Sequence, residues 1–347
     1  MTIIALVITF VLSLILTPIV KKFAFKIGAV DHPNSRKVHQ KVMPRLGGLA
    51  IVVSFLAGVL VFLPDTIQAW PVITGALIIV SIGVLDDIKE ISPRTKLAGQ
   101  IIAATITVVG GIQIDYITLP SGEVLQFGYY AIPITMIWIV GITNAINLID
   151  GLDGLAAGVS SIALLTISGL ALSMGNPLIA LLALLVLGST LGFLVFNFYP
   201  AKIFMGDSGS LFLGYMISVL AVMGLFKNVA MFSLIVPIIV LGVPILDTTF
   251  AIIRRIVKKK PLSAPDKFHL HHCLIKLGFS HRQTVVLIYT LSALFGVAAL
   301  IFTRATLWGS TLLLIGILIL VELIVEVTGL ISDKYRPLLH LIDGRKK

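Results

Sequence analysis

The sequence predicts an all-α, polytopic integral membrane protein of about 11 transmembrane helices, with its N-terminus outside the cell and its C-terminus in the cytoplasm. The 347 residues are 58% hydrophobic and 12% charged, and the mean hydropathy is +1.08. Soluble domains average about 45–50% apolar and about 25% charged residues. The composition therefore excludes an ordinary soluble enzyme, a disordered chain, a coiled coil and a disulfide scaffold. It predicts a single transmembrane domain over 1–347.

A helix needs about 20 apolar residues to cross the hydrocarbon core, and eleven segments meet this requirement to within a few residues. We expect the first span to be retained rather than cleaved as a signal peptide, because Lys21, Lys22 and Lys26 follow it and no positive charge precedes it. The predicted spans are 3–20, 46–63, 70–85, 97–114, 130–146, 154–173, 178–196, 209–224, 231–253, 284–302 and 307–331.

The distribution of positive charge predicts the orientation. Of the 26 Lys and Arg residues, only Lys227 and Arg304 fall outside the segments assigned to the cytoplasm, and this bias is typical of cytoplasmic loops. We attribute the net charge of +10 to contacts with membrane lipid and an anionic substrate, and we expect no nucleic acid. The single cysteine, Cys273, allows no intrachain disulfide. The predicted cytoplasmic segments are 21–45, 86–96, 147–153, 197–208, 254–283 and 332–347.

The residues suited to catalysis or binding lie in the same segments as the positive charge. Carboxylates, amides and histidines gather in the cytoplasmic segments, whereas external connections such as 174–177 carry little chemistry. A transporter places ionisable groups near mid-membrane, on broken helices. The distribution favours an enzyme with its active site at the cytoplasmic face, and a transporter of Mg²⁺ or of organic anions is the alternative.

A few carboxylates fall within or near the spans, where they are costly unless paired. Arg254 follows Asp247 by seven residues, so the two could share a helix face as a structural pair. The sequence indicates no role for Glu322 and Glu326.

Asp86 and Asp87 follow directly after the third predicted span, where it reaches the cytoplasm. Carboxylates at a helix C-terminus oppose the macrodipole by a few tenths to about 1 kcal/mol each. Two adjacent carboxylates there need a cation, either a metal ion or a lysine such as Lys96. A solvated acidic helix end is the alternative.

The run from Asn144 to Leu155 is the densest polar stretch of the chain. Its amides and carboxylates recur at three-residue spacing, so they would share one face of a helical turn. An N-cap on the sixth span explains one aspartate, but it does not explain two together with two asparagines. The four side chains are Asn144, Asn147, Asp150 and Asp153.

The segment 197–210 opens the eighth predicted span and contains a glycine-rich turn around Asp207. Glycines let backbone N–H groups approach an anion at a helix N-terminus, and Asp207 offers an oxygen ligand of the kind that Mg²⁺ prefers. A plain N-cap by Asp207 or Ser208 is the alternative.

Two further cytoplasmic loops combine histidines with positive charge. In the loop 254–283, a Lys/Arg run is typical of a lipid anchor, and no second Cys or distant His pair completes a structural zinc spacing. Its histidines are better suited to binding anions or stabilising charge. The cations of the loop 21–45 could bind phosphate or anchor the first two spans. The histidines are His269, His271 and His272 in the loop 254–283, and the cations are Arg36, Lys37 and Arg45 in the loop 21–45.

In combination, these motifs resemble those of the bacterial polyprenyl-phosphate N-acetylhexosamine-1-phosphate transferases of glycosyltransferase family 4, over nearly the full chain. The resemblance implies transfer of a sugar 1-phosphate from a UDP-sugar to undecaprenyl phosphate, with release of UMP, at the cytoplasmic face of the bacterial plasma membrane. It implies Mg²⁺ as cofactor, with Mn²⁺ as a substitute. The expected partners are undecaprenyl phosphate, a UDP-N-acetylhexosamine and membrane lipid. The sequence leaves the oligomeric state open, a homodimer included.

The resemblance also assigns roles to residues. It implies catalytic roles for Asp86, Asp87, Asp207 and His271, and metal ligation by Asp207 and Asn147. We expect direct attack of the prenyl phosphate, positioned or deprotonated by one of the paired aspartates, and a covalent aspartyl-phosphate route is the alternative. Together with the motifs above, the predicted substrate-binding set is Lys96, Asn144, Asp150, Gly151, Leu152, Asp153, Asn197, Phe204, His269, His272, Arg36, Lys37 and Arg45.

Two departures from one branch of the family predict the donor. The branch that transfers phospho-N-acetylmuramoyl-pentapeptide shows a lysine three residues after its second Asp, and three consecutive histidines. Here Glu90 holds the lysine position and Leu270 interrupts the histidines. Both features resemble the branch that uses UDP-N-acetylglucosamine (UDP-GlcNAc). We therefore expect UDP-GlcNAc as donor, with the muramoyl-pentapeptide reaction as the alternative.

Overall fold

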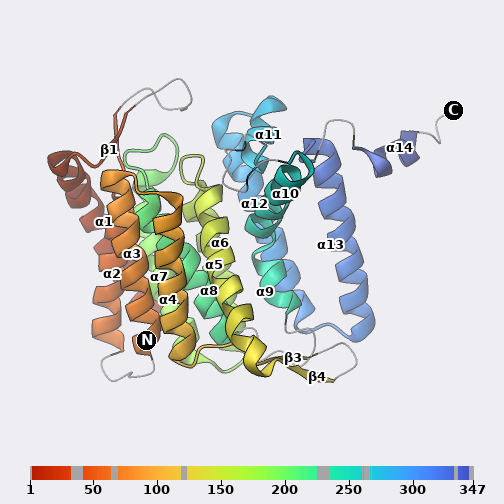
Figure 1. The fold of residues 1–347 in the computed structure, drawn as a ribbon, viewed down its shortest axis with the longest axis horizontal. Coiled ribbons are helices and arrows are strands. Elements are labelled where there is room, and N and C mark those ends of the chain that lie inside the picture. Colours follow the sequence, from red (N-terminus) through yellow and green to blue (C-terminus); the bar gives the residue numbers. More distant parts are fainter. Residues whose placement is uncertain are drawn as a thin grey trace.

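The computed structural model describes residues 2–32, 42–63, 69–118, 123–224, 234–259, 261, 266, 268–331 and 335–343. In these residues the chain is a bundle of helices with two short antiparallel hairpins (Figure 1). The hairpins pair β1 (Val30–Asp31) with β2 (Met43–Pro44), and β3 (Tyr116–Thr118) with β4 (Val124–Gln126). The helices are α1 (Thr2–Ile27), α2 (Gly47–Phe62), α3 (Trp70–Lys89), α4 (Pro93–Val109), η2 (Gly128–Tyr130), α5 (Ala131–Ile149), α6 (Leu155–Ser173), α7 (Pro177–Asn197), α8 (Gly206–Gly224), α9 (Ile235–Val240), α10 (Gly242–Val257), α11 (Leu270–Lys276), α12 (His281–Phe302), α13 (Leu307–Thr328) and α14 (Pro337–Asp343).

The helices confirm an all-α, multi-pass membrane protein. Within the described part of the chain, eight helices are long and apolar enough to cross a membrane: α1, α3, α5 with η2, α6, α7, α8, α12 and α13. α2 is apolar but has 16 residues, and α4 has 17. The number of eleven crossings and the orientation of the termini stay predictions.

Two of the predicted spans differ from the structure where a proline or a glycine interrupts the helix. The span predicted at 231–253 contains two helices, α9 and α10, that meet at Leu241. Pro244 has no amide hydrogen, so the carbonyl of Val240 loses its helical partner and the axis breaks. The span predicted at 97–114 begins at Pro93, after Ser92 caps it, and ends at Val109, because Gly111 takes a φ of +88° and turns the chain.

α8 is the centre of the bundle, where it contacts α2, α3, α5, α6 and α7. Its side chains are almost all buried. Two glycines bring neighbouring helices against its first turn: Gly48 of α2 lies against the backbone of Gly209, and Gly83 of α3 lies against the backbone of Ser208. Small residues at such contacts let helix backbones approach closely in membranes. The first turn of α8 is therefore held between two other helices.

The buried charged groups near the spans pair differently from the sequence prediction. The predicted pair of Asp247 with Arg254 is wrong. Arg254 pairs with Asp266 (Nη2–Oδ2 2.6 Å) and donates to the carbonyl of Leu330 (2.5 Å). Seven helical residues span about 10 Å along the axis, so chain segments that fold back onto α10 supply closer partners. Glu326, without a predicted role, is fully buried and accepts the first N–H groups of α14.

We expect Gly83→Ala to destabilise the protein by about 1–3 kcal/mol, because overpacking a close contact forces the helices apart. Its Cβ would lie 2.5 Å from the Cα of Ser208. Gly141→Ala in α5 is the matched control, since a Cβ there meets nothing within 4 Å. Midpoints of thermal unfolding in one detergent compare the two variants. Equal midpoints would contradict close packing of α3 on α8.

Candidate active site

A cavity of about 530 Å³ lies at one end of the bundle, among the loops that follow α3, α5 and α7. Most of the predicted site residues line it. They are Arg45, Asp86, Asp87, Asn147, Asp150, Gly151, Leu152, Asp153, Asn197, Phe204, Asp207 and His272. The fold thus brings together five sequence segments, the outermost of which are separated by about two-thirds of the chain.

Some predicted site residues lie elsewhere. Lys96 is not among the lining residues but binds two of them, whereas Asn144, His269 and His271 pack behind the wall. Arg36 and Lys37 lie outside the residues that the structure describes.

The cavity has five lining residues to which the sequence assigned no role. They are Asp31, Tyr199, Met205, Gly206 and His281. Asp31 lies in the loop 21–45, and Tyr199, Met205 and Gly206 lie in the segment 197–210, so membership of those segments was the available signal. His281 lies at the end of the loop 254–283, outside its group of three histidines at 269–272. His281 begins α12, and its ring contacts that of Tyr199 with centroids 4.5 Å apart and the ring planes tilted by 30°. A lone histidine at the start of an apolar span gave no such signal.

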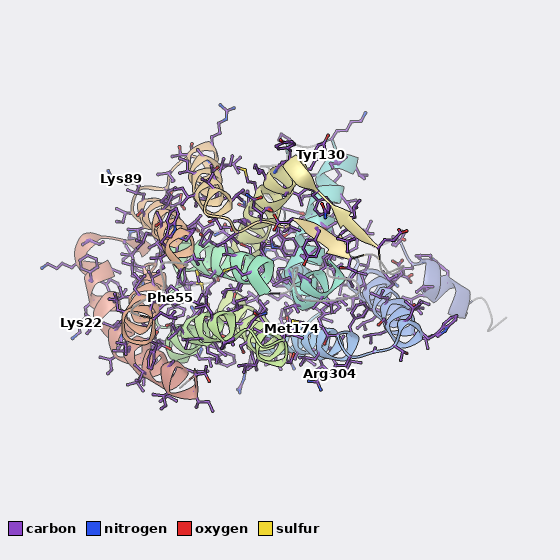
Figure 2. All side chains as sticks on the ribbon, turned by 90° about the horizontal axis from the view of Figure 1, so that it is seen from below. Lys22, Phe55, Lys89, Tyr130, Met174 and Arg304 are labelled. Carbon is purple, nitrogen blue, oxygen red and sulfur yellow. The ribbon has the colours of Figure 1, made fainter. Side chains whose placement is uncertain are left out.

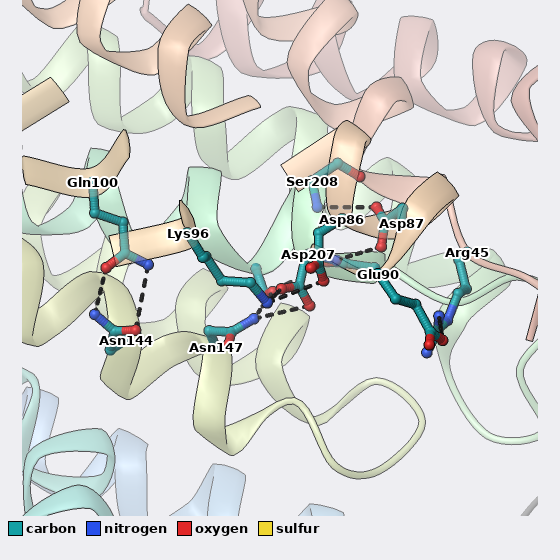
Figure 3. Close-up of polar contacts among 12 residues, drawn as sticks. Arg45, Asp86, Asp87, Glu90, Lys96, Gln100, Asn144, Asn147, Asp207 and Ser208 are labelled. Atoms are coloured by element: carbon teal, nitrogen blue, oxygen red, sulfur yellow. Dashed lines mark hydrogen bonds and ion pairs between the residues drawn. The ribbon is translucent and has the colours of Figure 1, made fainter. Parts of the chain in front are cut away.

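Asp87 anchors the first turn of α8. Its two carboxylate oxygens accept the N–H groups of Asp207 (2.8 Å) and Ser208 (3.0 Å), and the residue is 6% exposed (Figure 3). The first N–H groups of a helix lack intrahelical partners, and the helix dipole favours an anion there. Gly206 makes the turn possible: its φ is +71°, and a Cβ would collide with Asp87 and with the carbonyl of Arg45.

Asp86 and Asp207 share one lysine. The Lys96 ammonium lies 3.0 Å from Oδ2 of Asp86 and also pairs with Asp207 (Figure 3). Of the two adjacent aspartates, Asp86 therefore has the lysine that the sequence offered as counter-ion, whereas Asp87 is compensated by backbone N–H groups instead. Burial of Lys96 opposes its charged form, but the charges of Asp207 and Asp86 outweigh burial and raise the pKa of Lys96. The ammonium is therefore fixed between the two carboxylates.

Asn147 completes this cluster from α5. Its Nδ2 donates to Oδ1 of Asp207 (3.2 Å) and to Oγ of Ser210 (2.8 Å). One turn earlier, Asn144 exchanges two amide hydrogen bonds with Gln100 of α4 (2.6 and 3.3 Å). Asn144 therefore joins α4 to α5 and aligns the helices that carry Lys96 and Asn147.

The cavity carries an excess of negative charge. Arg45 forms ion pairs with Asp31 (3.1 Å) and Glu90 (3.2 Å) at one edge. Burial first, and then the charges of nearby aspartates, Asp207 foremost, raise the pKa of Asp150 to about 7. These carboxylates repel one another, so the site is suited to a ligand that brings positive charge.

Two loops of the cavity wall are tied together by side chains. Asn197 accepts the N–H of Gly154 (3.1 Å), donates to the carbonyl of Ile203 (3.0 Å) and is 3% exposed. Oδ2 of Asp153 accepts the N–H of Ala201 (2.9 Å). Both polar atoms of the Asn197 side-chain amide are hydrogen-bonded within the protein. Asn197 therefore shapes the cavity wall more than it offers hydrogen bonds to a ligand.

The histidine segment, residues His269 to His272, is attached to α10 through Asp247. This carboxylate binds Nδ1 of His269 (2.7 Å) and the N–H of Leu270 (2.6 Å). His271 is buried against Gly151, where any Cβ would collide with its ring. Burial lowers the pKa of His271 to about 3, so its ring is neutral at pH 7. Only His272 of the segment lines the cavity, and a catalytic role of His271 stays a prediction.

We expect Asp87→Asn to lower the free energy of unfolding by about 1–3 kcal/mol, because an amide cannot accept both N–H groups of the α8 turn and leaves a buried donor unpaired. Asp86→Asn is the matched control, since its carboxylate pairs with the half-buried Lys96. Thermal unfolding of both variants measures the difference. A loss for Asp86→Asn as large as that for Asp87→Asn would show that Asp87 has no special anchoring role.

Comparisons with known proteins agree with the predicted family. Residues 69–225, from α3 to α8, match the family described as Glycosyl transferase family 4. The chain is 52% identical over 337 residues to the Bacillus subtilis (strain 168) protein named "Probable undecaprenyl-phosphate N-acetylglucosaminyl 1-phosphate transferase", with 96% of this chain and 94% of the relative covered.

More distant relatives include proteins named for each of the two reactions considered above. The chain is 37% identical to the "Decaprenyl-phosphate N-acetylglucosaminephosphotransferase" of Mycolicibacterium smegmatis, with 90% of this chain and 84% of that one covered. It is 34% identical to the "Phospho-N-acetylmuramoyl-pentapeptide-transferase" of Halalkalibacterium halodurans, with 85% and 95% covered. The matched segment carries the Asp86, Lys96 and Asp207 cluster, and this chain belongs to glycosyl transferase family 4.

Proposed function

We propose that this protein transfers N-acetylglucosamine 1-phosphate from UDP-GlcNAc to undecaprenyl phosphate and releases UMP. The observation that carries the proposal is the Lys96-bridged pair of Asp86 and Asp207 in a cavity at the end of a membrane bundle. The relative that is 52% identical is named for this acceptor and this sugar. Such a reaction would be the first membrane step in the synthesis of a cell-envelope polysaccharide or teichoic acid.

The position of the cavity suits two substrates of different solubility. A prenyl phosphate has to approach from the bilayer, and a nucleotide sugar from water, so the reacting groups meet at the membrane surface. The cavity lies at the helix ends that carry the basic loops, and positive charge is typical of the cytoplasmic side. This supports an active site at the cytoplasmic face of the bacterial plasma membrane.

We propose Mg²⁺ as the cofactor, with Mn²⁺ as a substitute. The excess of carboxylates in the cavity fits a divalent cation, and Asp207 would hold it. Asn147 would be a second ligand through its side-chain oxygen, although its Nδ2 now faces Asp207. The described residues contain no cluster of three or more His, Cys, Asp or Glu arranged for a metal. Mg²⁺ does not need one, because it is commonly held by one or two carboxylates, substrate phosphates and water. When bound, the ion neutralises charge on the phosphates.

The adjacent residues Asp86 and Asp87 have different partners, which supports different roles for them. Asp87 uses both oxygens on the α8 turn, so Asp86 is the better placed to position or deprotonate the prenyl phosphate. An oxygen of that phosphate attacks the sugar-bearing phosphorus of the donor, and UMP leaves. Lys96 lies between Asp86 and Asp207, where its charge would meet the diphosphate. Positioning and charge neutralisation are the main requirements of such a transfer.

We expect Asp207→Asn to reduce turnover by roughly 10²-fold or more, because it removes charge from the reacting centre, while the protein stays folded. Asp115→Asn is the control, since Asp115 follows α4 at the other end of the bundle. Release of UMP by the purified protein, measured across Mg²⁺ concentrations, gives the rates. Near-normal turnover of Asp207→Asn at low Mg²⁺ would show that Asp207 is not the metal ligand.

The donor is tested by incubating the protein with undecaprenyl phosphate and each nucleotide sugar separately. We expect lipid product and UMP from UDP-GlcNAc, and none from the UDP-N-acetylmuramoyl-pentapeptide. Glu90 supports this outcome, because a negative side chain at the cavity edge, paired with Arg45, disfavours an anionic peptide. The opposite pattern would assign the muramoyl reaction, and no UMP with any donor would reject a transferase.

A further inference from the structure

A second cavity lies at the end of the bundle opposite the active site. α6 and α12 both begin beside the active-site cavity. The second cavity has a volume of about 460 Å³ and lies at the far ends of these two helices and at the turn before α13. Figure 2 shows Met174, which follows α6, beside Arg304 of that turn. Ser173 and Arg304 both line the cavity.

The walls of this cavity are apolar and open. Val297 and Ile301 are each 53% exposed, and Leu300 is 39% exposed. A Cβ at Gly169 would meet nothing within 4 Å, so the groove continues past this glycine. The hydroxyl of Ser173 already donates to the carbonyl of Leu170 (2.8 Å). Such walls suit an alkyl chain better than a hydrogen-bonding ligand.

One rim of the groove is positively charged. Arg304 contributes its guanidinium, and the lining residues include no carboxylate. No side-chain hydrogen bond or ion pair joins Arg304 to another of the described residues. α13 begins at Leu307, three residues later, so its N-terminal dipole adds to the positive potential. Arg304 is also one of two cations that the sequence places outside the cytoplasmic segments.

We propose that this groove binds an anionic phospholipid of the leaflet opposite the active site. The lipid phosphate binds the Arg304 guanidinium, which matches phosphate geometry with paired N–H donors. One acyl chain lies along Val297, Leu300 and Ile301 and passes Gly169. A zwitterionic lipid fits less well, because its own cation would approach Arg304. Free phosphate would bind only at Arg304 and would make no use of the apolar walls.

Photo-cross-linking of the full-length protein in lipid nanodiscs tests the proposal. The probes are phosphatidylglycerol and phosphatidylcholine with the same photoreactive acyl chain, and labelled peptides are mapped by mass spectrometry. We expect phosphatidylglycerol to label α12 near Ile301 about fivefold more than phosphatidylcholine, and Arg304→Gln to abolish this preference. Gly169→Leu, which has room for its side chain, should reduce labelling by both lipids.

Two variants serve as controls. Arg282→Gln removes an exposed arginine from the other end of α12 and should leave labelling near Ile301 unchanged. Gly316→Leu adds the same side chain where a Cβ also meets nothing within 4 Å, and should likewise have no effect. Thermal unfolding of each variant verifies that it is folded.

Three results would overturn the proposal. Equal labelling by the two lipids would show that Arg304 selects no headgroup, and full labelling in Gly169→Leu would place the lipid elsewhere. Protection by millimolar inorganic phosphate would indicate a site for free phosphate. Because the experiment measures lipid labelling, a negative result does not bear on the proposed transfer reaction. Likewise, failure to detect UMP release would not bear on lipid binding at Arg304.

Discussion

The bond of the Asp87 carboxylate to the first N–H groups of α8 is the interaction on which the site depends. A buried carboxylate is costly unless hydrogen bonds compensate it, and the N–H groups of Asp207 and Ser208 do so. The contact requires α3 and α8 to approach closely, which Gly83 permits. It also requires the left-handed turn at Gly206. The Asp87 carboxylate thereby fixes the backbone of Asp207, the proposed metal ligand.

Charge balance explains the rest of the cluster. Asp86 and Asp207 approach each other only because Lys96 lies between them. Lys96 is carried by α4, and α4 is aligned with α5 by the reciprocal amide pair of Gln100 and Asn144. Gln100 is 1% exposed, so this pair is shielded from competing water. The amide pair sets the positions of groups on both helices that reach Asp207.

The histidine segment belongs to a second layer of the site. Asp247 fixes its start to α10, and Gly151 leaves space for the ring of His271. Mutations of Asp247, His269 or His271 would change the shape of the cavity wall, whereas His272 lines the cavity itself. The site therefore consists of a set of residues around Asp207 that faces the cavity and a supporting set behind it.

Most of the fold and of the cavity lining could be predicted from the sequence. Apolar length predicts spans because a lipid-embedded backbone has to satisfy its hydrogen bonds within a helix. The motif residues converge because they follow helices that end at the same side of the bundle. Composition is thus enough to recognise a membrane enzyme, and residue type is enough to select Asp86, Asp207 and Lys96.

Only the tertiary structure decided how these residues divide their work. Adjacent aspartates look alike in sequence, yet Asp87 meets a helix N-terminus and Asp86 meets a lysine. The partner of Asp247 and the contact of His281 with Tyr199 likewise depend on segments far apart in the chain. Sequence determines which groups are available and on which side of the membrane they are expected. Their hydrogen-bond partners are set by three-dimensional packing, because partners are chosen by distance in space and not by separation along the chain.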